Sequence, residues 1–471
     1  MKKDIKFGTG GFRGIIDNDF TLFNVSFIAE ALSQIILEDR AKKEIPLCYD
    51  RRFLSPEAAM AMALVFASHD IKVHMPFTEV PSPCASFWTQ ELDADYGVMI
   101  TASHNPSDWN GVKIFTKGGF DADEKTTDRI QKKIGEIDTF SVISEEEARD
   151  KGILVFFDAV TKYVDNIFRF SKTKLIHPLK VAYDNLNGVG IVSLGEAAER
   201  IGMEEFKVLN WEKDPTFRGK LPNPLPQNLE EVRSFVLENH YDMGFGVDSD
   251  GDRLGVIDEK GDYVSANEIL ACLYYYLIKI KGLKGDVVRN FVTSLLLDRI
   301  AEGLGFRCHE VDVGFKYITR KMEECDAVIG GESSGGLTIR DYLRGKDATF
   351  SVVLFWNMMD DMHLPVSEIV KQVKAFAHYE NVDVETFVTY PRDKAGNIVS
   401  YLNENNPSFP RPIVKRDILG RNYRYWFNDE EWATLRLSNT ENVLRVFLEL
   451  KPHEDVATYR SCLRDFVAKM I

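Results

Sequence analysis

Long apolar runs, paired cysteine motifs and an apolar N-terminal segment are all missing from this 471-residue sequence. The longest apolar runs, such as Ile269–Ile278, fall short of the roughly 20 residues that a transmembrane helix needs. The six cysteines are scattered without CxxC or zinc-finger spacing, which indicates reduced, mostly buried thiols. Met1–Asp4 leads into glycine-rich sequence rather than an apolar signal core. We therefore expect a soluble, cytoplasmic protein that does not enter a membrane.

A surplus of positive charge is missing as well. The chain has 73 acidic side chains against 58 lysines and arginines, a net charge of -15. Such a balance disfavours nucleic acid or an anionic membrane as the main partner. A phosphate-bearing ligand would need cations gathered locally, so single arginines and lysines inside polar motifs become candidates for binding it. We expect a small-molecule ligand, and a monomer or a homodimer.

Strands and helices alternate through most of the chain, which predicts layered α/β domains. The length is too great for one core and predicts about three or four domains. In the first segment, strands are predicted at Ile45–Asp50, Ile71–Phe77 and Tyr96–Ile100. Ser55 is predicted to be the N-cap of a helix that has Pro56 at its first position. Two further segments repeat this pattern at similar size, which suggests a repeated domain.

The last segment differs from the other three. It has predicted strands at Val382–Thr389, Thr434–Leu437 and Val443–Leu450, then a helix at Val456–Met470, and so resembles a smaller α+β unit. The charged stretch Asp138–Lys151 is the first plausible linker. The predicted domains are residues 1–150, 151–258, 259–372 and 373–471.

Thr101–Pro106, called the serine loop below, follows the predicted buried strand Tyr96–Ile100. Pro106 keeps the preceding residue out of the α region, so Ser103 and His104 are held on a stiff turn. The end of a strand is a common place for a functional site in an α/β sheet. On its own, this stretch could also be an ordinary polar turn.

A second polar loop, Asp248–Arg253, follows a buried strand and is called the metal loop below. Asp248, Asp250 and Asp252 can direct three carboxylates to one point, and hard oxygen ligands suit Mg²⁺. An EF-hand fails because a strand pattern that includes Val256 and Ile257 comes between the loop and its twelfth position, Glu259. The DxD motif of a nucleotide-sugar glycosyltransferase is a competing interpretation.

Other polar residues complete a set suited to phosphoryl transfer, which needs positioned cations, a metal, a nucleophile and a base. Ser103 can be the nucleophile, and Lys113 or His104 can exchange the proton of an incoming hydroxyl. Glu332 can accept two hydrogen bonds from sugar hydroxyls. Four residues near the C-terminus suit a phosphate that is not transferred: Arg436, Ser438, Asn439 and Thr440. The set indicates an enzyme that acts on a phosphorylated polyol or sugar.

These motifs resemble those of the α-D-phosphohexomutases, the phosphoglucomutase/phosphomannomutase superfamily, over essentially the whole chain. TASHNP, DxDGDR, GExSGG and RxSNT occur in the family's order, one in each segment. The resemblance implies three similar α/β/α domains and a C-terminal TATA-binding-protein-like α+β domain around a central cleft. It also implies Mg²⁺ bound by Ser103 and the three aspartates, and a hexose 1,6-bisphosphate as activator and intermediate.

The resemblance further implies a mechanism. A phosphorylated Ser103 would donate its phosphoryl group to a hexose 1- or 6-phosphate, and the bisphosphate would turn over in the cleft and return its other phosphoryl group. Arg13 and Arg253 would steady the transferring group, with Lys113 as general base and His104 assisting. The residues implied to bind substrate are Glu332, Ser334, Lys316, Arg436, Ser438, Asn439 and Thr440. The fourth domain is expected to move as a lid.

Two departures bear on the sugar. Gly336 stands where dual-specificity phosphomannomutases often have His, and Glu441-Asn442 replaces the Glu-Pro that is found in the phosphoglucosamine branch. We therefore expect glucose phosphate as substrate, then mannose phosphate, then glucosamine phosphate. Lys316 could also be a solvent-exposed lysine at a helix start, and Arg445 is interpreted as a surface residue outside the site. A glycosyltransferase and a non-catalytic sugar-phosphate sensor are the alternatives from other classes.

Overall fold

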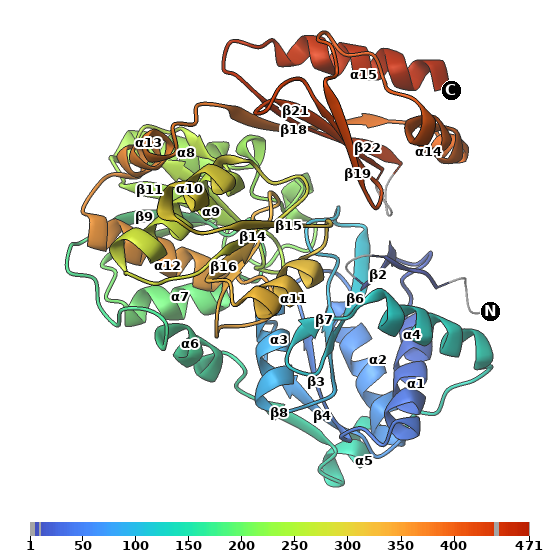
Figure 1. Cartoon of the computed structure of the whole chain (residues 1–471). Coiled ribbons are helices and arrows are strands. Elements are labelled where there is room, and N and C mark those ends of the chain that lie inside the picture. The colour runs from blue at the N-terminus through green and yellow to red at the C-terminus, as the bar shows by residue number, and fades with distance from the viewer. Residues whose placement is uncertain (1–4, 9–10, 438–441, 471) are drawn as a thin grey trace.

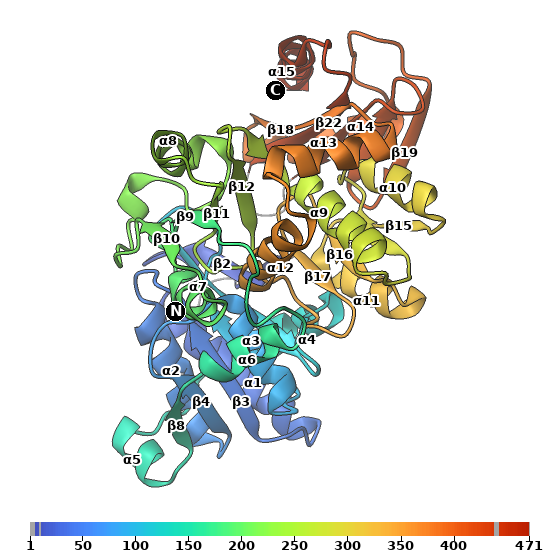
Figure 2. The ribbon, with the colours of Figure 1, turned by 90° about the vertical axis from the view of Figure 1, so that its left-hand side faces the viewer.

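The computed structural model describes residues 5–8, 11–437 and 442–470. The chain forms three α/β/α units and a fourth unit built on an antiparallel sheet, as expected. The second and third units lie between the first unit, in blue, and the fourth, in red (Figure 1). A view turned by 90° shows the same order, with the fourth unit packed against the third (Figure 2).

The first unit is built on a sheet in the order β1-β2-β6-β5-β3-β4-β8, with β7 paired to β6. Strands β5, β3, β4 and the edge strand β8 pair in parallel, and β6 is antiparallel to β5. The strands are Phe7–Gly8, Gly11–Ile15, Glu44–Tyr49, Lys72–Pro76, Tyr96–Ile100, Trp109–Thr116, Phe120–Asp121 and Leu154–Phe157. The helices α1 to α6 are Leu22–Glu38, Ser55–Ser68, Ser82–Glu91, Glu124–Glu136, Glu145–Asp150 and Thr161–Phe168.

Two positions in this unit differ from the sequence prediction. Ser55 is the first residue of α2 rather than its N-cap, because Leu54 holds the cap position in a left-handed conformation (φ 64°). The Ser55 hydroxyl instead donates to Asp50 Oδ1 at 2.8 Å. The stretch predicted as a linker contains α5, and β8 then pairs with β4, so the first sheet continues to residue 157.

The second unit has the sheet order β10-β9-β11-β12-β13. Its strands β9 to β13 are Lys180–Asp184, Glu205–Leu209, Met243–Val247, Leu254–Asp258 and Tyr263–Val264. Helices α7 and α8 are Ile191–Arg200 and Glu230–Asn239, with 3₁₀ turns at Phe217–Gly219 and Pro226–Asn228. Strands β11 and β12 form a buried antiparallel pair, and the metal loop is the turn between them.

The third unit has the sheet order β15-β14-β16-β17. Strands β14 to β17 are Val287–Asn290, Cys308–Val311, Ile329–Gly331 and Leu337–Ile339. Helices α9 to α13 are Ala266–Tyr275, Leu296–Leu304, Phe315–Cys325, Ala348–Met362 and Val366–Ala377, and a π-helix, Tyr276–Ile280, extends α9. One apolar core joins α3 of the first unit to the second and third units, so these three units are packed as one body.

The fourth unit is a fully antiparallel sheet in the order β18-β22-β21-β20-β19. Strands β18 to β22 are Val382–Thr389, Lys415–Leu419, Asn422–Trp426, Trp432–Leu437 and Val443–Leu450. Helices α14 and α15 are Ala395–Glu404 and Val456–Met470, with a 3₁₀ turn at Arg392–Lys394. Trp432 and Phe447 pack on Val292 of the third unit. Strands β19 and β20 and helix α14 were not predicted from the sequence.

Within the described part of the chain, no helix combines the length and apolar character that crossing a bilayer requires. All six cysteines are free thiols, and Cys48, Cys84 and Cys272 are buried. Burial raises the pKa of Cys48 to about 12, so this thiol stays protonated and unreactive.

Candidate active site

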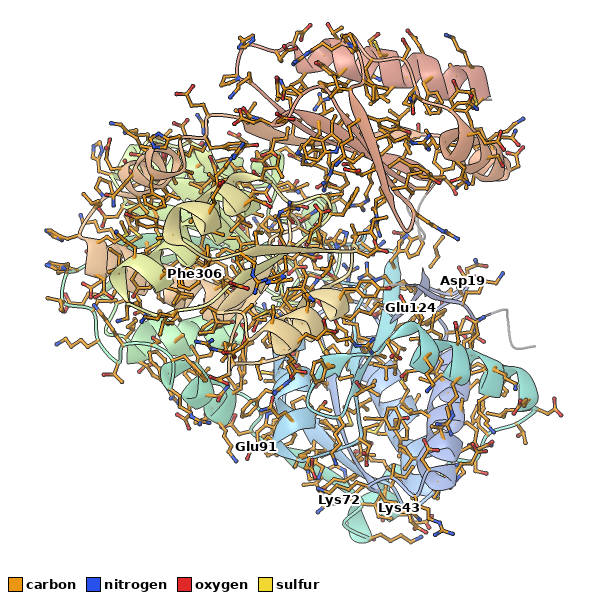
Figure 3. The ribbon with its side chains drawn as sticks, viewed as in Figure 1. Asp19, Lys43, Lys72, Glu91, Glu124 and Phe306 are labelled. Carbon is orange, nitrogen blue, oxygen red and sulfur yellow. The ribbon has the colours of Figure 1, made fainter. Side chains whose placement is uncertain are left out.

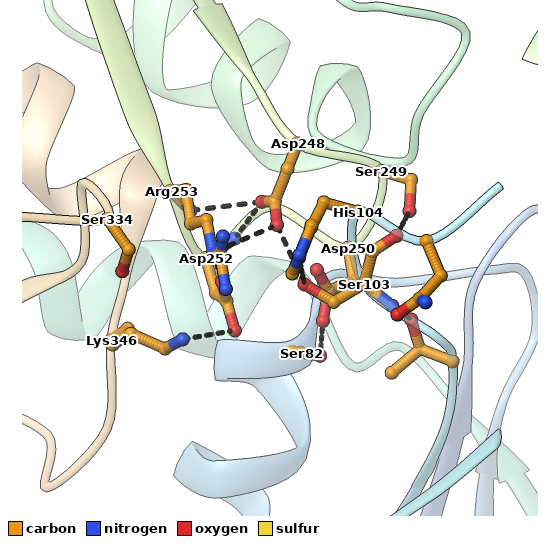
Figure 4. Close-up of polar contacts among 12 residues, drawn as sticks. Ser82, Ser103, His104, Asp248, Ser249, Asp250, Asp252, Arg253, Ser334 and Lys346 are labelled. Carbon is orange, nitrogen blue, oxygen red and sulfur yellow. Dashed lines mark hydrogen bonds and ion pairs between the residues drawn. The ribbon is translucent and has the colours of Figure 1, made fainter. Parts of the chain in front are cut away.

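The serine loop presents Ser103 to the metal loop of the neighbouring unit. The Ser103 hydroxyl donates to Asp248 Oδ2 at 2.9 Å, and His104 Nδ1 lies 3.4 Å from the same hydroxyl (Figure 4). Ser103 adopts a φ of 51°, which is uncommon for a residue with a β carbon and marks a strained backbone held by its surroundings. The sequence prediction brings these residues together, and the structure shows them in contact.

Asp248, Asp250 and Asp252 are buried, and their nearest carboxylate oxygens lie within 4.8 Å of one another. The Oδ1 atoms of Asp250 and Asp252 are buried without a hydrogen-bond partner. Buried carboxylate oxygens that lack donors and converge on one point are what a hard divalent cation such as Mg²⁺ needs. The residues present therefore fit this metal.

Burial and mutual repulsion act on the three carboxylates unequally. Burial, with the charges of Asp250 and Asp252, raises the pKa of Asp248 well above its usual value. Burial also opposes ionisation of Asp252, but Lys113, Lys346 and Arg253 outweigh it and hold the pKa of Asp252 well below its usual value. A metal ion would relieve the repulsion that these charges impose on one another.

Lys113, on β6, is ion-paired to the metal loop. Its Nζ donates to Asp250 Oδ2 and Asp252 Oδ2, both at 2.7 Å. Burial alone would favour the neutral amine, but the two carboxylates outweigh it and raise the pKa of Lys113. His104 differs, because burial and the nearby Arg253 and Arg13 lower its pKa well below the usual value. At neutral pH the imidazole is therefore neutral and the lysine charged.

Arg13 and Arg253 lie at the same centre. Arg13 Nη1 donates to Asn105 Oδ1 at 2.5 Å, and its pKa is lowered by burial and by Arg253. Arg253 Nε lies 3.8 Å from Asp248 and 3.7 Å from Asp252, and this nitrogen makes no hydrogen bond although it is buried. Two mutually repelling guanidinium groups that face one site are suited to bind a phosphate between them.

Glu332 and Ser334, which the resemblance implies bind substrate, lie together in the loop between β16 and β17. The Ser334 hydroxyl donates to Glu332 Oε1 at 2.6 Å, and Asn290 Nδ2 donates to Oε2 at 3.3 Å. Lys346, which the sequence analysis missed, lies 3.3 Å from Asp252 (Figure 4). The same lysine lies 3.7 Å from Glu332. Lys346 therefore links the predicted sugar-binding residues to the metal loop.

Lys316 points toward the first unit. Its side chain is buried, and Nζ lies 2.5 Å from Glu124 Oε1. Figure 3 marks Glu124 at the start of α4. The Tyr317 hydroxyl donates to the same carboxylate at 2.7 Å, and Arg320 pairs with Asp123 at 2.6 Å. Lys316 is thus part of a polar contact between the first and third units, and not the solvent-exposed lysine that the sequence analysis considered.

The fourth unit contributes Arg436, which directly faces Arg445 across the β21–β22 pair. Burial and Arg445 lower the pKa of Arg436, and Arg445 is also among the cations that lower the pKa of His104. Arg445 is therefore close to the site, whereas the sequence led us to interpret it as a surface residue outside the site. Ser438, Asn439 and Thr440 lie outside the described residues.

Arg52 is a second residue that the sequence analysis missed. It is fully buried behind the serine loop and forms an ion pair with Asp50 at 3.6 Å. Burial lowers its pKa to about 10, so the guanidinium stays charged at neutral pH. Its only sequence signal is that an arginine follows a predicted strand end, at Asp50-Arg51-Arg52.

Comparisons with known proteins give one answer for the three α/β/α units. Residues 4–140, 155–261 and 265–376 match the families described as phosphoglucomutase/phosphomannomutase, alpha/beta/alpha domains I, II and III respectively. The phosphoglucomutase of Staphylococcus epidermidis is 30% identical, over 74% of this chain and 68% of its own length. The chain belongs to the phosphoglucomutase/phosphomannomutase family. The resemblance seen in the sequence is thereby confirmed.

Two other relatives of the family cover nearly the whole chain. A probable phosphoglucosamine mutase of Methanosphaera stadtmanae is 28% identical, over 99% of this chain and 98% of its own length. The crystal structure of a putative phosphomannomutase from Thermus thermophilus superposes with a TM-score of 0.84 at 25% identity, covering 99% of this chain and all of its own. These relatives are phosphohexomutases, so this protein is an enzyme of that class and has the family's four-unit fold.

Proposed function

We propose that this phosphohexomutase interconverts the 1- and 6-phosphates of a hexose through a phosphate carried on Ser103. The observation that carries the proposal is the 2.9 Å contact between the Ser103 hydroxyl and Asp248, beside two further carboxylates and two arginines. A nucleophile, a metal site and phosphate-binding cations thus meet at one point, which phosphoryl transfer requires.

Asp248, Asp250 and Asp252 would hold Mg²⁺ together with an oxygen of the phosphorylated Ser103. When bound, the metal ion would withdraw negative charge from the phosphoryl oxygens. Arg13 and Arg253 would orient the same group by charge-assisted hydrogen bonds.

Proton transfer is assigned from the contacts. Lys113 donates to two carboxylates and would balance the charge of the metal loop. His104 Nδ1 lies 3.4 Å from the Ser103 oxygen, within reach of a proton that leaves or joins the reacting hydroxyl. We therefore place His104 ahead of Lys113 as the proton acceptor, which reverses the order inferred from the sequence.

The second phosphate of the substrate would bind to the fourth unit. Arg436 and Arg445 offer two cations, and the neighbouring stretch 438–440 supplies hydroxyl and amide groups in the sequence. A hexose 1,6-bisphosphate with one phosphate here and the other near Ser103 could exchange its ends by turning in the cleft. It would then act as both intermediate and activator.

For the sugar, we place glucosamine phosphate first and glucose phosphate second, with mannose phosphate next. The relative from M. stadtmanae, which matches essentially the whole chain, is named for glucosamine, whereas the relative named for glucose covers 74% of the chain. Glucose was expected first from the sequence, and the names of the relatives favour the alternative. Glu332 can accept hydrogen bonds from either a hydroxyl or an amino group.

Six free thiols support a cytoplasmic location.

The test is a coupled mutase assay with glucosamine 6-phosphate, glucose 1-phosphate and mannose 1-phosphate, each with Mg²⁺ and a trace of the matching 1,6-bisphosphate. We expect turnover that Ser103→Ala abolishes, with the highest kcat/KM for glucosamine 6-phosphate. UDP-glucose serves as the control for the glycosyltransferase alternative. Folded, metal-loaded protein that turns over none of the three phosphates would contradict the proposed reaction, and a higher kcat/KM for glucose would contradict the order of sugars.

A further inference from the structure

Arg52 contacts the main chain of the serine loop through its guanidinium group. Its Nη1 donates to the carbonyl oxygens of Pro106 at 2.7 Å and Trp109 at 3.0 Å. Its Nη2 donates to the carbonyl oxygens of Asn105, at 2.6 Å, and of Ser103. One buried guanidinium therefore binds four main-chain carbonyl groups between residues 103 and 109. Buried carbonyl oxygens need donors, and Arg52 supplies one to each of these four.

The backbone of Ser103 is held on both sides. Its N–H donates to Thr101 Oγ1 at 2.8 Å, and the Thr101 hydroxyl donates in turn to Asp50 Oδ2 at 2.6 Å. Its carbonyl oxygen accepts from Arg52. Asp50 and Arg52 are themselves ion-paired, so one short segment fixes both polar groups of a residue whose φ is 51°. The direction of the Ser103 side chain follows from this constraint.

The same contacts reach the metal loop. The Ser249 hydroxyl donates to the Ser103 carbonyl oxygen, the atom that Arg52 also binds. Arg52 Nη2 lies 3.4 Å from this hydroxyl. The Arg52 guanidinium also lies over the ring of Phe217 of the second unit, 4.9 Å from its centroid. Arg52 thus lies where the serine loop, the metal loop and the second unit meet.

We infer that Arg52 is a positioning residue that holds the Ser103 backbone so that the side-chain oxygen points at Asp248. It acts through the serine loop, since its close contacts are with carbonyl groups, Asp50, Ser249 and Phe217 rather than with the carboxylates of the metal loop. The inference rests on the proposed function insofar as Ser103 carries the phosphate. Its expected signature is a loss of kcat with little change in KM, because a small displacement of a reacting atom slows the chemical step.

The test compares Arg52→Lys with Arg51→Lys. Arg51 is the adjacent arginine, and it pairs instead with Glu79 and the Trp211 carbonyl. A lysine at 52 keeps the charge but offers one nitrogen in place of the guanidinium fork. We expect kcat to fall 10- to 100-fold in Arg52→Lys with KM within about twofold, and no change in Arg51→Lys. Amides of residues 103–105 should exchange with deuterium faster only in Arg52→Lys.

A second, milder substitution tests the same contact in case Arg52→Lys does not fold. Ser249→Ala removes the hydroxyl that shares the Ser103 carbonyl, and kcat should fall several-fold. The double variant should lose less than the product of the two single losses, because both act through one atom. Unchanged kcat and unchanged loop exchange in Arg52→Lys, or unchanged kcat in Ser249→Ala, would overturn the inference. A raised KM at constant kcat in Arg52→Lys would overturn it too.

The exchange measurement separates this inference from the proposed function. If the wild type turned over no hexose phosphate, the proposed reaction would fail while the comparison of loop exchange would still decide whether Arg52 holds Ser103. If the wild type is active and the loop of Arg52→Lys stays protected, the positioning role fails alone.

Discussion

Gly336 leaves the space that the Lys346 side chain occupies, since a β carbon at residue 336 would lie 2.1 Å from Lys346 Cδ. From the resemblance in the sequence, this glycine is the position at which we expected histidine in a dual-specificity phosphomannomutase. The structure gives the departure a physical meaning: the missing side chain makes room for a cation that reaches both Glu332 and Asp252.

Gly336→Ala should therefore lower kcat/KM by about tenfold, equivalent to about 1.4 kcal/mol. The new methyl group displaces the lysine from its two carboxylate partners, and Lys346→Met should give a similar loss. Steady-state kinetics test this, with Gly135→Ala as control because a β carbon at 135 meets no atom within 4 Å. Wild-type kinetics in both site variants would show that Lys346 has no part in the reaction.

Asp248→Asn should raise the melting temperature of the metal-free protein by a few degrees and abolish its response to Mg²⁺. The substitution removes one of three crowded buried charges, and an asparagine Oδ1 can still accept from the backbone N–H groups of Asp252 and Arg253. Calorimetry with EDTA and with Mg²⁺ measures both effects, and the exposed Asp150→Asn is the matched control. An Asp248→Asn protein that Mg²⁺ still stabilises as much as the wild type would speak against the metal site.

The attachment of the fourth unit should depend on pH through Glu449, which is fully buried on β22. It accepts from the Leu295 N–H at 3.1 Å and from the Ser294 hydroxyl of the third unit, with Tyr379 and Asp383 beside it. Burial raises its pKa from 4.5 to about 7. The folded protein therefore keeps a proton that the unfolded chain loses, so stability falls as pH rises from about 4.5 to 7.

By linkage the change at full extent is roughly 3 kcal/mol. Glu449→Gln should flatten this pH dependence, and melting temperatures between pH 5 and 8 measure it. The control is Glu404→Gln, at the exposed end of α14. Parallel pH profiles for Glu449→Gln and the wild type would argue against a titration at this position.

Lys316→Met and Glu124→Gln should change KM in opposite directions, each several-fold. If Lys316 binds substrate, it must first leave Glu124, which lies 2.5 Å away. Neutralising Glu124 releases the lysine and should lower KM, whereas removing the lysine should raise it. Sugar-phosphate titrations measure both values. If the contact is purely structural, the two substitutions should instead lower the stability of the protein alike. The melting temperatures of both variants would then fall by similar amounts.

Arg436→Met and Arg445→Met should each raise KM for the sugar phosphate by about tenfold or more, since each removes one of two cations that face each other across β21 and β22. The increase should shrink in high salt, because screening weakens the remaining attraction. Kinetics at two ionic strengths provide the measurement. An unchanged KM in Arg445→Met would return this residue to the role of a strand surface arginine paired with Glu385.

The elements of the first three units could be predicted closely because their strands are apolar runs bounded by polar loops. Tyr96–Ile100, for example, is a strand with the predicted bounds. Strand β20 was missed because it contains Arg424, which does not look like a core residue. Its burial depends on Glu310 of the third unit, 2.7 Å away, and on the Phe291 ring. No pattern within the strand reveals such a partner.

The polar loops of the site were predicted because their residue types sit together in the sequence. Arg52, Lys346 and Arg445 were not, because each acts through a contact that only the fold creates. Arg52 binds carbonyl oxygens, which carry no side-chain signature. Lys346 depends on empty space at Gly336, and Arg445 depends on the register of two strands. The prediction that Ser55 is an N-cap was wrong for a related reason, since its hydroxyl donates a hydrogen bond to Asp50.

The contacts of the metal loop can form only in a certain order while the chain is being synthesised. Its backbone is bonded to the first unit through the Ser82 N–H, 2.8 Å from the Asp250 carbonyl oxygen, and to the third unit through the Ala348 N–H, 3.1 Å from that of Gly251. During synthesis, a ribosome that has just released the metal loop must add nearly a hundred further residues before Ala348 can join it. Until then the three aspartates of the metal loop lie close together without the contacts that the third unit provides. The surroundings of the metal loop are thus completed only once the third unit has been made, although Ser103 belongs to the first unit.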